Sequence, residues 1–191
     1  MSTELSYIVL TGGRSTRLGA DKATTVIAGK TLLSHLIDSL PHASTILVVG
    51  DEVEGIQRVS WIREEPAFSG PASAIAAALP SISTERVAVI AVDMPYGAEI
   101  IASLNSRLMA GSDALVPVDG EDFPQSLSAI YSVNALRVAI NAMQPIAGKS
   151  MRELLSHLNY TAVRLGEDFV TKLIDIDTPD DLEKVRHARV D

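Results

Sequence analysis

Short apolar runs along this chain alternate with stretches whose apolar residues recur at helical spacing. Residues 87–92 are apolar at every position, which is typical of a central strand in a parallel sheet that is covered on both faces. The other predicted strands cover residues 7–10, 46–49, 59–63, 114–118, 126–131, 161–165 and 172–176. Among these, residues 126–131 alternate in polarity, so we expect this strand to be antiparallel to its neighbours.

Amphipathic helices are predicted between these strands. In residues 31–40 the apolar side chains fall on one face, and Pro41 ends the helix. The remaining internal helices are predicted over residues 72–79, 100–108, 135–143 and 151–158. A last helix has Thr178 as its N-cap and Pro179 at its first position. Repeated strand–helix units of this kind predict an α/β fold with a mostly parallel sheet.

Composition places the chain among ordinary globular proteins. Its 191 residues suit a single domain over residues 1–191, and 47% hydrophobic content is enough for a buried core. Cysteine is absent, which excludes a disulfide framework, a cysteine nucleophile and thiolate metal sites. The formal net charge of -8 disfavours nucleic-acid binding. The first residues lack the features of a secretory signal and no apolar run could span a bilayer, so we expect a cytoplasmic protein that binds no membrane.

The most informative segment is residues 10–22, LTGGRSTRLGADK, which directly follows the first predicted strand. Its adjacent glycines, Gly12 and Gly13, allow a sharp turn that presents backbone N–H groups. Arg14, Arg17 and Lys22 add three cations to this short part of an acidic protein. Backbone N–H groups combined with fixed positive charge suit a triphosphate.

A solvated turn with surface cations stays the alternative for this segment. Adjacent glycines exclude the dinucleotide-binding fingerprint, and the spacing from Gly13 to Gly19 excludes a P-loop. Residues 148–150, GKS, imitate the end of a P-loop, but Met143 stands where its first glycine belongs and no strand precedes it. We interpret that match as chance.

Carboxylates follow several of the predicted strands, namely Asp51, Glu64, Glu65, Asp93, Asp119, Asp175 and Asp177. The carboxyl ends of parallel strands meet at one edge, where the glycine-rich segment must also lie. Because Mg²⁺ binds one or two carboxylates together with substrate phosphates, this edge predicts a magnesium site. Asp93 is the main candidate ligand, and an N-cap role in the next helix is its alternative. Asp177 is free to be a second ligand because Thr178 already caps the last helix, although a solvated pair with Asp175 is equally compatible.

Residues 10–22 resemble the signature of the molybdenum cofactor nucleotidyltransferases, above all the guanylyltransferases. The family pattern, approximately LxGGxSxRMGxDK, is matched except at Leu18, where Met is usual. The resemblance continues through residues 29–32 (GKTL), 70–71 (GP), 93–95 (DMP) and 175–182 (DIDTPDDL). It implies a Rossmann-like three-layer α/β/α nucleotidyltransferase fold with a mostly parallel, partly mixed sheet.

The resemblance also implies an enzyme and its reaction. This reaction is the transfer of GMP from GTP to molybdopterin, with Mg²⁺ and with release of pyrophosphate. By position, Leu10, Gly12 and Gly13 would contact the nucleotide, Lys22 would bind phosphate and catalyse the transfer, and Asp93 would bind the metal.

Three further residues complete the expected site. Glu65 falls where the family commonly has an Asp before Pro, which assigns it to the nucleotide. The charge of a triphosphate adds Arg17 as a catalytic cation beside Lys22, and Asp177 as a second metal ligand. Many guanylyltransferases have Asn where this chain has Asp177, so a cytidylyltransferase, or another nucleotidyltransferase with a different phosphorylated acceptor, stays open.

The expected acceptor is a phosphate monoester, which is largely dianionic at neutral pH because its second pKa is about 6. It needs no general base, and none of the 4 histidines stands in a catalytic or metal-binding motif. Whether molybdopterin arrives alone or on a delivering partner protein stays open. A nucleotide-binding regulator without transfer activity is the rival from another functional class, while a Rossmann oxidoreductase lacks its glycine spacing.

Overall fold

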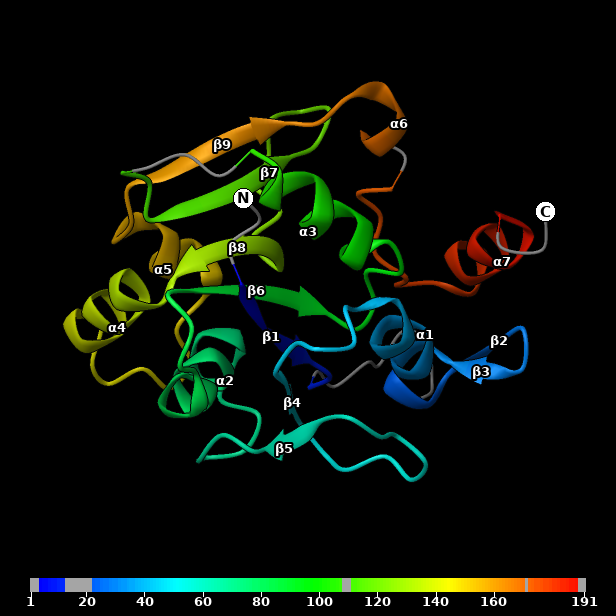
Figure 1. Cartoon of the computed structure of the whole chain (residues 1–191), viewed down its shortest axis with the longest axis horizontal. Coiled ribbons are helices and arrows are strands. Elements are labelled where there is room, and N and C mark those ends of the chain that lie inside the picture. Colours follow the sequence, from blue (N-terminus) through cyan, green and yellow to red (C-terminus); the bar gives the residue numbers. More distant parts are fainter. Residues whose placement is uncertain (1–3, 13–21, 108–110, 171, 189–191) are drawn as a thin grey trace.

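A computed structural model describes residues 4–12, 22–107, 111–170 and 172–188 of the chain (Figure 1). Its main feature is a seven-stranded sheet with the order β5-β4-β1-β6-β8-β7-β9. The strands are β1 (Leu5–Leu10), β4 (Ile46–Val49), β5 (Ser60–Ile62), β6 (Arg86–Ala91), β7 (Ala114–Val118), β8 (Ser128–Ser132) and β9 (Tyr160–Arg164). Only the pairings of β8 with β6 and β7 are antiparallel within this sheet. The predicted mostly parallel, partly mixed sheet is therefore confirmed, as is the antiparallel strand.

Helices cover both faces of the sheet and produce three layers (Figure 1). One face packs against α1 (Leu32–Ser39) and α3 (Gly97–Asn105), and the other against α2 (Pro71–Ala78), α4 (Val133–Ala142) and α5 (Met151–Ser156). Successive residues of β1 alternate between the two cores: Tyr7 and Val9 belong to the first, and Ile8 and Leu10 to the second. This double burial explains why the central strands are apolar without alternation.

Polar side chains fix the starts of several helices. Thr31 accepts a hydrogen bond from the backbone N–H of Ser34 at the start of α1, and Ser132 caps α4 in the same way. Ser150 and Glu153 form a capping box on α5. The serine of the GKS triplet at residues 148–150 therefore starts a helix, which explains its presence without a P-loop. Thr178 exchanges hydrogen bonds with Asp181 at the start of α7 (Pro179–Ala188), as expected for the predicted N-cap. No helix in the described part of the chain has the length and apolar character needed to cross a membrane.

The order in which the chain adds strands to the sheet changes side between β1 and β6. After β1 the chain adds β4 and then β5 on one side, and it returns to place β6 on the other side of β1. Two segments that leave neighbouring parallel strands therefore diverge here, one at Thr11 and the other at Val92. In open α/β sheets such a point leaves a crevice at the carboxyl ends of the strands, where ligands bind.

The predicted strand over residues 172–176 is wrong. This segment forms no ladder with the sheet; it crosses the carboxyl edge, and the backbone N–H of Ile176 donates to the carbonyl of Asp93 at 2.9 Å. Leu173 and Ile176 are buried in the core on the α1–α3 side. The apolar spacing that suggested a strand thus reflects packing against this layer rather than strand pairing.

Smaller elements complete the described structure. Val26–Ile27 (β2) and Lys30–Thr31 (β3) form a short antiparallel hairpin that was not predicted. Two 3-10 helices, η1 (Lys22–Thr24) and η2 (Leu79–Ser81), and the short α6 (Glu167–Val170) are further additions. η1 matters for the site because it begins at Lys22.

Candidate active site

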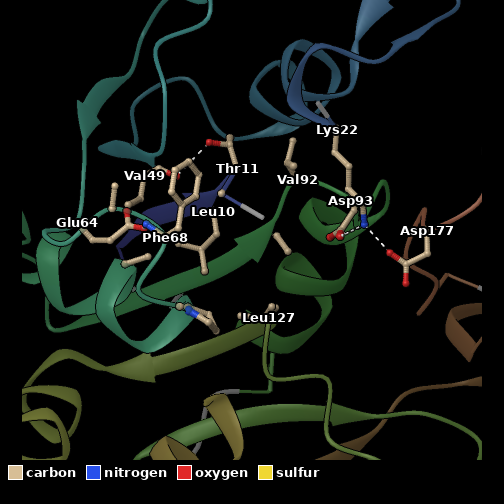
Figure 2. Close-up of a pocket in the computed structure, with 16 residues that line it drawn as sticks. Leu10, Thr11, Lys22, Val49, Glu64, Phe68, Val92, Asp93, Leu127 and Asp177 are labelled. Carbon is tan, nitrogen blue, oxygen red and sulfur yellow. Dashed lines mark hydrogen bonds and ion pairs between the residues drawn. The ribbon is translucent and has the colours of Figure 1, made fainter. Parts of the chain in front are cut away.

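A pocket of about 920 Å³ opens at the carboxyl edge of the sheet, where β1 and β6 end (Figure 2). Its lining comes from the ends of β1, β4 and β6, the start of η1, the loop after β5, the start of α2, and the segments before β8 and α7. The lining residues are Leu10, Thr11, Gly12, Lys22, Val49, Glu64, Ala67, Phe68, Gly70, Pro71, Ala74, Ala91, Val92, Asp93, Leu127 and Asp177. The pocket therefore lies where the strand order predicts a ligand.

Lys22 joins two carboxylates from distant parts of the chain. Its Nζ lies 2.7 Å from Oδ2 of Asp93 and 2.5 Å from Oδ1 of Asp177 (Figure 2). The exposed fractions of these side chains are 14% for Lys22, 22% for Asp93 and 44% for Asp177. Lys22, the residue two positions beyond β6 and the residue before Thr178 thus meet at one point of the pocket wall.

The charges around Lys22 keep it protonated. Burial lowers the pKa of the Lys22 ammonium, but hydrogen bonds and attraction to Asp177 and Asp93 outweigh this, and the net pKa is raised. Asp175 keeps an exposed surface, yet its pKa is raised, first by desolvation and then by repulsion from Asp177 and Asp93. Among the described residues, the Lys22 ammonium therefore contacts two carboxylates, and Asp175 lies close enough to both for their charges to raise its pKa.

The backbone fixes Asp93 at the rim. Asp93 stands two residues beyond the end of β6, in a turn where the N–H of Met94 donates to the carbonyl of Ala91 at 3.0 Å. Its own carbonyl accepts the hydrogen bond from Ile176. Helix α3 begins only at Gly97, with Tyr96 as N-cap, so Asp93 is not the N-cap that was considered as its alternative role.

The profile of the family described as "MobA-like NTP transferase domain" matches residues 7–163. The chain belongs to this family. As a MobA-like NTP transferase domain it is a nucleotidyltransferase, and the resemblance carried by residues 10–22 is confirmed.

Similar proteins agree with this assignment. A protein of Pelotomaculum thermopropionicum named "probable molybdenum cofactor guanylyltransferase" is 27% identical over 186 residues, which cover 94% of this chain and 90% of that protein. A protein of the same name from Natronomonas pharaonis is 28% identical over an alignment of 198 positions, which covers 96% of this chain and 97% of that protein.

Solved structures confirm the fold. Molybdopterin-guanine dinucleotide biosynthesis protein A from Archaeoglobus fulgidus is similar with a TM-score of 0.77 and 23% identity, over 97% of this chain and 99% of that one. The 2-C-methyl-D-erythritol 4-phosphate cytidylyltransferase from Thermus thermophilus is similar with a TM-score of 0.71 and 17% identity, over 98% and 100%. The Rossmann-like nucleotidyltransferase architecture is thus shared by enzymes named for different nucleotides.

The carboxylates of this MobA-like domain suit a magnesium ion that is shared with a substrate. Asp93 and Asp177 both approach one cation, the Lys22 ammonium, so their oxygens converge on a common point. The described residues contain no group of three or more His, Asp or Glu side chains placed to hold a metal alone. Two carboxylates completed by phosphate oxygens and water are what Mg²⁺ commonly accepts.

The structure brings together part of the set that the sequence predicted. Leu10 and Gly12 line the pocket with the Lys22 cluster, whereas Gly13 and Arg17 lie outside the described residues. Glu65 is exposed and does not line the pocket, but the neighbouring Glu64 does. The nucleotide-binding role of Glu65 stays a prediction.

Sequence reasoning missed several lining residues, including one at an unspecified position of the signature in residues 10–22 and others outside every motif. Among them are Thr11, Val49, Phe68 and Leu127. Thr11 and Val49 directly follow or end strands at the same edge, so the strand-end argument would have found them. Nothing in the hydrophobic pattern singles out Phe68.

Proposed function

We propose that this chain transfers GMP from GTP to molybdopterin in a Mg²⁺-dependent reaction, with molybdopterin guanine dinucleotide and pyrophosphate as products. The family assignment and the names of the similar proteins support this choice of substrates. The observation that carries the proposal is the meeting of Lys22, Asp93 and Asp177 at the pocket wall.

Lys22 is the central phosphate-binding group in this proposal. Its ammonium is held at the pocket by two carboxylates, and the backbone of Gly12 lines the same pocket. A triphosphate brings more negative charge than either carboxylate, so Lys22 would exchange at least one of them for phosphate oxygens. Arg17 is the proposed second cation.

The reaction needs charge neutralisation rather than a base. A phosphate monoester of the acceptor is largely dianionic at neutral pH, so its oxygen attacks the α-phosphorus without losing a proton. The new P–O bond replaces the bond to pyrophosphate, which leaves as the other product. No histidine is among the described residues that line the pocket. Positioning and electrostatic stabilisation by the Lys22 cluster would supply the rate enhancement.

Asp93 and Asp177 would hold the metal ion once Lys22 has turned toward the phosphates. When bound there, Mg²⁺ would neutralise phosphate charge. The acidic character of the cluster, with Asp175 as a third nearby carboxyl group, favours such a cation. A protein that delivers molybdopterin to this edge is compatible with the proposal.

Pyrophosphate release from each of the four nucleoside triphosphates, with and without molybdopterin, tests the proposed function. We expect release only with GTP and molybdopterin together, and its loss when EDTA removes the metal. Release with CTP instead would assign cytidylyl transfer to the same site. Binding of a nucleotide without release under any condition would favour a regulator and contradict the proposal.

A further inference from the structure

Phe68 is an aromatic residue that lines the pocket without belonging to either core. More than half of its surface is exposed, at 53%. Its backbone lies in the left-handed region with φ of 61°, where a bulky residue is strained. The carboxylate of Glu64 accepts a hydrogen bond from the Phe68 backbone N–H at 2.8 Å and holds this turn. A strained, exposed aromatic residue held in a pocket points to contact with a ligand.

The Phe68 ring is also supported by a cation. The guanidinium carbon of Arg63 lies 5.1 Å from the ring centroid, a cation–π distance. Arg63 is in turn paired with Asp51, which follows β4. These contacts position the ring at the pocket wall, where the residue is 53% exposed.

Phe68 and the Lys22 cluster occupy opposite ends of the pocket. Figure 2 shows Phe68 and Glu64 at one end, and Lys22, Asp93 and Asp177 at the other. A nucleoside triphosphate has the same polarity, with charged phosphates at one end and a flat base at the other. The end of the pocket near Phe68 also includes the apolar side chain of Val49.

We propose that the Phe68 ring is the surface on which the nucleobase of the substrate stacks. This inference rests on the proposed function, because it requires the phosphates to bind at Lys22. Every base has a π-face, so stacking of this kind strengthens binding without choosing among bases. Phe68 therefore contributes to affinity for the nucleoside part of the substrate, and leaves binding of the phosphates unchanged.

Calorimetric titration with GTP and with inorganic tripolyphosphate separates these two contributions. In Phe68→Leu we expect GTP to bind roughly tenfold more weakly, within the range found for base–aromatic stacking, and tripolyphosphate to bind as in the wild type. Phe123→Leu is the matched control, because Phe123 is 62% exposed and does not line the pocket. It should bind both ligands normally.

Two further variants separate the ring from the backbone strain. Asn tolerates the left-handed region, so Phe68→Asn relaxes the turn and still removes the ring; it should lose GTP affinity as Phe68→Leu does. Phe68→Tyr keeps a ring and should bind GTP as the wild type does. Tight GTP binding by Phe68→Leu or Phe68→Asn would overturn the stacking role while leaving the proposed function intact.

Two other outcomes are equally decisive. If the Phe68 variants keep their GTP affinity and lose affinity for a free pterin, the ring serves the acceptor and the proposal is overturned. If the wild type binds ribose 5-triphosphate, which has the same triphosphate ester but no base, no more weakly than GTP, the base has no contact to lose and the stacking role fails. Absence of any GTP binding by the wild type would contradict both this inference and the proposed function.

Discussion

Lys22 is a single ammonium group held by two carboxylates that come from distant parts of the sequence. Without a ligand, its charge is already satisfied by Asp93 and Asp177 at 2.7 and 2.5 Å. The same two carboxylates are the proposed metal ligands, so ammonium and metal compete for them. Phosphate binding by Lys22 and metal binding by the aspartates should therefore support each other.

Removing the Lys22 ammonium should strengthen metal binding in the absence of nucleotide. In Lys22→Met we expect Mn²⁺, used as a probe for Mg²⁺, to bind about tenfold more tightly, because the ammonium that competes for both aspartates is lost. GTP should bind at least about tenfold more weakly, because its phosphates lose a cation. Electron paramagnetic resonance measures free Mn²⁺, and calorimetry measures GTP binding. Unchanged Mn²⁺ affinity would show that Lys22 does not block the aspartates.

Neutralising Asp93 should abolish transfer without unfolding the protein. Asp93→Asn keeps the shape of the side chain but removes its charge, and we expect turnover to fall by at least about 100-fold. Pyrophosphate release measures turnover, and circular dichroism tests the fold. Asp122→Asn is the control, because Asp122 is exposed and pairs with Arg164 outside the pocket. A normal rate in Asp93→Asn would contradict the proposed metal role.

At the residue scale, the sequence predicts site residues best where a charged side chain stands at the end of a strand. Asp93 could be placed at the edge because it follows a central strand, and Lys22 because it ends the glycine-rich motif. Asp177 also lies at this edge, although the strand predicted before it does not form. The place of Phe68 in the pocket wall could not be predicted, because it depends on a positive φ and on Arg63 lying over the ring. Such loop conformations are determined by tertiary contacts rather than by hydrophobic periodicity.

Close packing between α3 and β6 fixes the turn that carries Asp93. A Cβ atom at Gly97 would collide with Cγ2 of the fully buried Ile90. We expect Gly97→Ala to destabilise the protein by about 1–3 kcal/mol, because neither α3 nor Ile90 has room to move. Gly166→Ala is the matched control, since nothing lies within 4 Å of a Cβ there. Urea denaturation checks both variants, and equal midpoints would refute the close approach.

The capping box of α5 should make the folding stability of the protein depend on pH in the acidic range. Hydrogen bonds from Ser150, first from its backbone N–H, together with Lys149, lower the pKa of Glu153 to about 2. Because this pKa is lowered on folding, the stabilisation is present above the ordinary glutamate pKa of 4.5 and is lost as the pH falls toward 2. The melting temperature of the wild type should therefore exceed that of Glu153→Gln at neutral pH. A difference that persists unchanged at about pH 2 would contradict this.

At the element scale, periodicity predicted the helices and strands whose apolar faces meet the sheet or form it. It failed for residues 172–176, where Leu173 and Ile176, three positions apart, pack on the α1–α3 layer instead of belonging to a paired strand. It also missed the β2–β3 hairpin, whose turn uses positive φ values at Ala28 and Gly29. Ala is uncommon at such a position, so the sequence carries only a weak signal for this turn.

At the scale of the whole molecule, the order of the strands determines where the pocket lies. The class of the fold follows from repeated strand–helix units, but the return of the chain to place β6 beside β1 does not. Strand pairing is non-local, and many orders satisfy the same hydrophobic pattern. The location of the candidate site at one edge of the sheet could be predicted. The residues that line the pocket could be identified only once the order of the strands was known.

Packing of the C-terminal segment should control both stability and activity. Ile176 is fully buried, donates its N–H to Asp93 and directly precedes Asp177. We expect Ile176→Ala to cost about 2–4 kcal/mol, because it leaves a cavity, and to lower turnover, because Asp177 loses its anchor. Ile176→Val should cost only about 1 kcal/mol and keep most activity. Urea denaturation and pyrophosphate release measure the two effects; full activity in a clearly destabilised Ile176→Ala would show that Asp177 needs no such anchor.

The three-way contact of Lys22 has a consequence for synthesis on the ribosome. Asp93 lies 71 residues and Asp177 lies 155 residues after Lys22, so the last partner is made long after the first. A nascent chain that has emerged only as far as β9 has the sheet strands but lacks one of the two carboxylates that balance the ammonium. Until residue 177 leaves the exit tunnel, Lys22 in the growing polypeptide can pair with Asp93 but not with Asp177. The second ion pair is therefore among the last contacts of the fold to form.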